Sequence, residues 1–151
     1  MNKIISLAVF GLILVSCSPK VIPYQRTGEV NAVSHENSIV TVSSVGRAGS
    51  KNTAIHYAER NAFENILFKG VPNTNQESPL IPDENTALRN NEKLISSLLT
   101  KEGYLRYIMD SYTITSNNSG GVHVVDQSVK IDIKALRKYL ESQGILKKFG
   151  L

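Results

Sequence analysis

The segment from Thr53 to Phe68 constrains the fold more than any other part of the chain. Apolar residues recur along it at three- and four-residue spacing, as one stripe made of Ala54, Ala58, Ala62, Ile55, Phe63, Ile66 and Leu67. That period predicts an α-helix with one apolar face. Ser50 can cap its start, and Gly70 followed by Pro72 predicts its end. Because three stripe positions are alanines, we expect the helix to pack close against a sheet.

Three other segments have the composition of β-strands. Residues 38–45 are rich in β-branched side chains and precede Gly46 and Gly49, which predicts a strand and then a turn. Residues 104–116 alternate in part, with Ile108, Tyr112 and Ile114 in phase, although the first turn is compatible with a helix. Asn117–Gly121 is typical of a hairpin turn. Residues 122–133 alternate well: Val125, Gln127, Val129, Ile131 and Ile133 share one face, and Asp126, Ser128, Lys130 and Asp132 share the other.

Two further helices complete the expected fold. Residues 91–100 read as a short helix, and residues 134–143 as a last helix that Asp132 caps and Gly144 ends. The order is β-α-(loop)-α-β-β-α. This order predicts the α+β class, with helices packed on one face of a small antiparallel sheet.

The segment from Val71 to Asn90 is long for a loop in a compact domain, and loops of this length are often functional or disordered. It holds three prolines and one apolar pair, Leu80 and Ile81. We take this pair as a possible partner-binding contact. The alternative is that both side chains tuck under the domain. If the loop is only a spacer, the strand face carrying Asp126 and Lys130 is the next candidate surface.

The N-terminus has the features of an export signal. Lys3 precedes an apolar run over residues 4–15, which is too short to stay as a membrane span. Leu14-Val15-Ser16-Cys17 resembles the bacterial lipobox, and this resemblance implies cleavage before Cys17 and a lipid on its sulfur. We therefore expect a signal peptide at 1–16, a lipidated Cys17 and tether at 17–37 with a short strand near residues 30–33, and a single domain at 38–151. Cys17 is the one cysteine, so no disulfide is expected.

The charge balance argues against a nucleic-acid partner. The chain holds 17 Lys+Arg and 13 Asp+Glu, and the basic residues are scattered rather than clustered with aromatic ones. The densest pairs, Arg137-Lys138 and Lys147-Lys148, are typical of solvated helix faces.

No residue pattern points to catalysis, a metal or a cofactor. The three histidines lie in separate elements, without a metal-ligand spacing. Asp126 and Asp132 lie about 20 Å apart on an extended strand, too far to act together. The segment from Gly46 to Thr53 leads from strand to helix but lacks the spacing of a phosphate loop. It leaves a possible anion-binding group of Arg47, Gly49, Ser50 and Lys51 at a helix N-terminus, with a plain capped turn as the alternative.

Two packing patterns carry a resemblance. Residues 54–70 and the strand-to-helix ending at 129–145 resemble small Gram-negative envelope lipoproteins, which are also similar to flagellum-associated lipoproteins and to the N-terminal domain of FlgT. The resemblance implies a helix-on-sheet domain with an accessory, non-enzymatic role in an envelope assembly, and it transfers no catalytic residue.

The residue that follows Cys17 bears on the expected location of the protein. Ser18 after the cysteine favours outer-membrane anchoring by analogy with sorting rules, and either face of that membrane stays open. We therefore expect a protein partner in the envelope. The alternative is a periplasmic or surface lipoprotein that binds a small ligand or a cell-wall fragment in a pocket beside the 71–90 loop.

Overall fold

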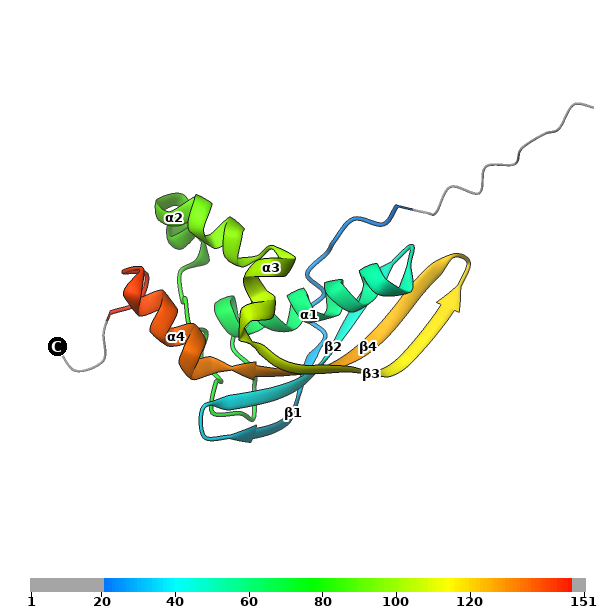
Figure 1. Cartoon of the computed structure of the whole chain (residues 1–151), viewed down its shortest axis with the longest axis horizontal. Coiled ribbons are helices and arrows are strands. Elements are labelled where there is room, and N and C mark those ends of the chain that lie inside the picture. The colour runs from blue at the N-terminus through cyan, green and yellow to red at the C-terminus, as the bar shows by residue number, and fades with distance from the viewer. Residues whose placement is uncertain (1–20, 148–151) are drawn as a thin grey trace, which may run out of the picture.

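The computed structural model describes residues 21–147, which form a four-stranded antiparallel sheet with helices packed against it (Figure 1). The strands lie in the order β1-β2-β4-β3 and span Val30–Glu36 (β1), Ile39–Ala48 (β2), Ile108–Ser119 (β3) and Val122–Asp132 (β4). The helices span Lys51–Phe68 (α1), Glu84–Leu98 (α2), Lys101–Tyr104 (α3), the 3₁₀ turn Leu105–Tyr107 (η1) and Ile133–Ser142 (α4). The predicted α+β class is confirmed.

Helix α1 lies directly on the sheet, as its alanine row predicts. Ala54, Ala58 and Ala62 are fully buried, and the Ser50 hydroxyl accepts a hydrogen bond from the Thr53 amide at 3.2 Å. The closest approach is at Gly46, where an added Cβ would lie 2.0 Å from the Ala54 carbonyl oxygen. Gly46 therefore belongs to β2, which runs on to Ala48, and not to the turn that the sequence analysis placed there.

The β3–β4 hairpin turns on two glycines with positive φ, Gly120 and Gly121, and it contains two bulges. The first bulge adds a residue between Ile108 and Asp110. Ile108 therefore lies opposite Ile131 on the helix side, whereas Tyr112 lies opposite Ser128 on the other side. The common phase expected for Ile108 and Tyr112 is wrong for this reason.

The long loop is shorter than the sequence suggested, because α2 begins at Glu84 under an Asp83 cap. Leu80 and Ile81 are each 4% exposed and belong to the main core. Their amides donate to the carbonyls of Ile66 and Leu67 at 3.2 and 2.7 Å, so the chain folds back beside the last turn of α1. The geometry supports the alternative in which this pair tucks under the domain, and it removes the pair from the exposed surface.

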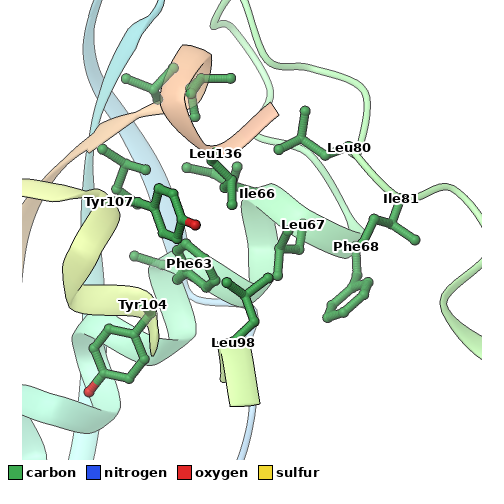
Figure 2. Close-up of a cluster of buried hydrophobic side chains, with 14 of the residues drawn as sticks. Phe63, Ile66, Leu67, Phe68, Leu80, Ile81, Leu98, Tyr104, Tyr107 and Leu136 are labelled. Carbon is green, nitrogen blue, oxygen red and sulfur yellow. The ribbon is translucent and has the colours of Figure 1, made fainter. Parts of the chain in front are cut away.

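The core sits between the sheet and the helices. In Figure 2, Phe63, Ile66 and Leu67 of α1 meet Leu98 of α2 and Leu136 of α4. Aromatic rings close one side of the cluster, with the ring of Phe63 stacked at 6.0 Å from Tyr107 and tilted at 6.1 Å from Tyr104.

The sheet begins earlier in the chain than expected. The strand anticipated near residues 30–33 runs from Val30 to Glu36 and pairs with β2. The expected domain boundary at residue 38 thus falls in the turn between two paired strands. Residues 21–29 also contact the domain, and the folded unit includes them.

Candidate binding face

No helix of residues 21–147 covers one face of the sheet (Figure 1). We call it the open face: the side of the four strands that points away from α1. Three large apolar side chains of β3 are roughly half exposed there, with Tyr112 the most exposed at 57%; the others are Met109 and Ile114. Within residues 21–147, the main hydrophobic core lies on the opposite side and includes Phe63 of α1, Leu98 of α2 and Leu136 of α4.

The bulges in β3 explain why these three side chains share one face. Each bulge sets two consecutive residues against one residue of β4, and both then point to the same side. Asp110 pairs with Lys130 and Thr115 with Asp126. Because Met109 and Ile114 are exposed, we assign each of them to the same side as the residue that follows it. Met109, Tyr112 and Ile114 therefore line up along the edge strand, although strict alternation would separate Met109 from the other two.

Polar groups surround this apolar row. Asp110 and Lys130 are cross-strand neighbours at one end of it, and small side chains, Ser43 and Ser128, pair at the middle of the sheet. The Asp126 Oδ1 atom is buried and accepts no hydrogen bond from any residue in the described range. A buried acceptor without a hydrogen bond is energetically costly. A donor from another molecule would therefore stabilise this carboxylate.

On the other side of the sheet, a buried polar chain links α1 to the hairpin. Ser111 donates to Glu59 at 2.9 Å and accepts from Gln127 at 2.7 Å, and the second oxygen of Glu59 lies 3.2 Å from His56 Nδ1. Ser111 thus contacts a carboxylate and not a histidine. Burial raises the pKa of the neighbouring Tyr104 hydroxyl.

The possible anion-binding group is placed as a capped turn. Arg47 pairs with Glu29 at 3.0 Å, and the Ser50 hydroxyl is used by the Thr53 amide. Lys51 is exposed and Gly49 lies in the turn beside it. Two of the four groups therefore have partners within the protein, which favours the plain capped turn.

Two cavities lie beside the loop that precedes α2. One has a volume of about 290 Å³ and is lined by residues such as Pro82, Thr86, Asn90 and Ile145. The other has about 230 Å³ and lies among Asn37, Gln76 and Lys134. Ligand pockets usually measure about 300–1,000 Å³, so both are small for that role.

Three further observations bear on function. Between residues 21 and 147, no three His, Cys, Asp or Glu side chains gather where they could hold a metal ion, and no helix is long and apolar enough to cross a membrane. The proposed lipidation residue, Cys17, lies outside the described residues. Comparison of the chain with protein families, curated proteins and solved structures finds no match.

Nothing in the sequence marks Met109 as a binding residue. The nearest signal was the strand face of Asp126, Ser128, Lys130 and Asp132, which the structure places on the open face with the apolar row. The apolar row lies on this face because of the bulges in β3, and a bulge leaves no local pattern in the sequence.

Proposed function

We propose that this protein is a non-enzymatic lipoprotein, anchored in the outer membrane by a lipid on Cys17, which binds a protein of the cell envelope through the open face of its sheet. The lipobox-like sequence supports the anchor. The apolar row of Met109, Tyr112 and Ile114 on an uncovered sheet face is the observation that supports the binding role.

The chemistry of the open face suits a protein partner. Contiguous exposed apolar side chains rimmed by charges mark interaction surfaces in soluble domains. Tyrosine and methionine are enriched in interface cores because they bury large areas, and here Asp110 and Lys130 form a polar rim. The outer side of β3 also has backbone groups that no strand of the sheet pairs, and such an edge can accept a strand from a partner.

A photo-crosslinking amino acid at position 112 tests this proposal in intact membranes. We expect adducts from Tyr112 and none from Lys93, an exposed residue of α2 on the helix side. The double substitution Met109→Ser/Ile114→Ser should remove the adducts while the melting temperature barely changes, because both side chains are already about half exposed. The same adducts from both positions, or adducts that survive the double substitution, would contradict the proposal.

The cavity beside α2 supports a second candidate, the binding of a small ligand or a cell-wall fragment. Its lining combines the apolar Pro82 and Ile145 with the amide of Asn90, a mixture that a small polar ligand could use. Asn90→Trp would fill the cavity. Under this alternative the substitution abolishes binding of soluble cell-wall fragments and leaves the Tyr112 adducts intact.

A further inference from the structure

Residues Val21–Glu29, which we call the strap, lie along α1 instead of hanging free. The Tyr57 hydroxyl donates to the Ile22 carbonyl at 3.3 Å. The Tyr24 ring meets Tyr57 edge-on at 5.2 Å, and the Arg60 guanidinium lies 4.1 Å from the centre of the Tyr24 ring. Burial, together with the charge of Glu64, raises the pKa of the Tyr24 hydroxyl, so this ring stays neutral at physiological pH.

Arg26 joins the strap to two helices, and we call its ion pairs with Glu64 and Glu84 the clamp. Its Nε donates to Glu64 of α1 at 2.6 Å, and its two terminal nitrogens donate to Glu84 of α2 at 2.7 and 2.9 Å. The guanidinium also lies 5.1 Å from the centre of the Phe68 ring. Two-pronged arginine–carboxylate pairs are the strong and directional kind of ion pair. Arg26 therefore fixes the strap at the C-terminal half of α1.

The strap runs parallel to α1, and the chain joins the domain at a defined place. Arg26 contacts the second half of the helix, whereas Ile22 contacts Tyr57 in the first half. Ile22 and Pro23 also line a small cavity with Arg47 and Val122. The chain thus enters at the end of the molecule formed by residues 47–53 and 117–123, which we call the entry end. In Figure 1 this end holds the start of α1 and the tip of the β3–β4 hairpin, opposite α4.

Few residues separate this end from Cys17. Val21 follows Cys17 by four residues, and four residues span at most about 14 Å. If residues 17–29 were all free, Val30 could lie about 45 Å from Cys17. The strap therefore shortens the reach of a lipid anchor about threefold.

The entry end has a small excess of positive charge, because Lys51 is exposed there while Arg47 is paired with Glu29. Residues 47–53 and 117–123 contain Arg47, Lys51 and His123 and no carboxylate. The nearest carboxylate in the strap, Glu29, pairs with Arg47. At the other end of the same strands, Asp132 lies opposite Ile39, which also pairs with Glu36.

We propose that the strap holds the entry end of the domain against the anionic headgroups of the membrane that carries the Cys17 lipid, an inference that rests on the proposed anchor. The short reach brings this end to the surface, and its lack of unpaired acid lets it stay there. The open face runs along the length of the sheet, away from the entry end. It therefore faces sideways and is not covered by the membrane.

Fluorescence quenching in vesicles tests the orientation. The full lipidated protein is reconstituted in vesicles of phosphatidylethanolamine and phosphatidylglycerol that carry a headgroup quencher. A thioether at Cys17 does not react with maleimides, so a new cysteine takes the label at either Asn118→Cys in the entry end or Lys138→Cys in α4. We expect several-fold stronger quenching at position 118. Equal quenching at both positions would overturn the proposal.

Two comparisons separate the contributions of the strap and of charge. Arg26→Gln should bring quenching at position 118 close to that at position 138, whereas Arg89→Gln, at an exposed position of α2, should change nothing. If Arg26→Gln does not fold, Glu84→Gln removes the less buried half of the clamp and makes the same test. If a folded variant keeps the wild-type ratio of quenching at position 118 to quenching at position 138, the clamp does not set the orientation. In neutral phosphatidylcholine vesicles the ratio should fall, and an unchanged ratio would rule out the part played by charge.

Flotation distinguishes failure of this inference from failure of the proposed anchor. Protein that does not float with the vesicles contradicts the Cys17 anchor and, with it, the orientation. Protein that floats but shows no difference between the two labels contradicts the orientation alone.

Discussion

Glu64 shows how the strap allows a buried charged residue to lie on α1. Its side chain is 3% exposed and lies between two guanidinium groups, with Arg60 Nε at 2.7 Å and Arg26 Nε at 2.6 Å. A buried carboxylate is tolerated only when it is paired and hydrogen-bonded. Asn61 is also buried, and its side chain donates to Thr27 at 2.8 Å. Helix α1 can therefore carry buried polar residues where the strap supplies their partners.

Gly46 gives a prediction about the helix–sheet spacing. Gly46→Ala should lower the free energy of unfolding by about 1–3 kcal/mol or more, because the new methyl group meets the backbone of α1, which cannot move aside locally. Thermal or urea unfolding measures the loss. Ser43→Ala, on the open face of the same strand, is the control and should have little effect. A Gly46→Ala variant as stable as the wild type would mean that the helix sits farther from the sheet.

The Arg26–Glu84 pair gives a prediction about pH. The hydrogen bond from Arg26 lowers the pKa of Glu84 below 4.5, its ordinary value. A carboxylate with a lowered folded-state pKa stabilises the fold fully above its unfolded pKa and loses this effect as the pH falls toward the folded value. Glu84→Gln should therefore be less stable than the wild type at pH 7, with the difference shrinking below about pH 4.5. Urea unfolding from pH 7 to pH 3 checks this, and a difference independent of pH would count against the pair.

Among the elements, those with a strong local period were predictable and those set by distant contacts were not. The alanine row identified α1 and its contact with the sheet, and alternation identified β4 and its two faces. The strap has no period, and Arg26 finds its partners 38 and 58 residues away. The bulges in β3 depend on pairing with β4, so the row of Met109, Tyr112 and Ile114 could not be seen in the sequence alone.

The segment before α2 gives a prediction about its own role. Leu80→Ser with Ile81→Ser should destabilise the domain by about 2–5 kcal/mol for each buried side chain, since both sit in the core. A thermal melt measures the loss. Val33→Ser, which changes an exposed aliphatic residue of β1, is the control. A double variant that melts like the wild type, but loses the Tyr112 adducts, would restore the pair as a partner contact.

For the whole molecule, the arrangement places three surfaces in a fixed relation. The open face lies on one side of the sheet, the helices lie on the other, and the strap leads to the entry end. The α+β layer order was predictable from the sequence of elements. The relation between the entry end and the open face was not, because it depends on the strap lying parallel to α1.

The anchor gives the last prediction. Cys17→Ser should abolish lipidation, so that metabolic labelling with a clickable fatty acid marks the wild-type protein and not the variant. Ser18→Ala, which leaves the cysteine in place, should keep the label. Label retained on the Cys17→Ser protein would contradict the proposed anchor.

The docked strap also has a consequence for encounter rates. With Cys17 as the proposed anchor, a tether of about 14 Å confines the domain to a volume roughly thirtyfold smaller than a tether of about 45 Å would allow, because volume scales with the cube of reach. A neighbour in the same bilayer then meets the domain at a correspondingly higher local concentration. A molecule that is fixed farther away than this tether can extend cannot contact the domain. Release of Arg26 would therefore change which molecules the domain can contact without altering the open face itself.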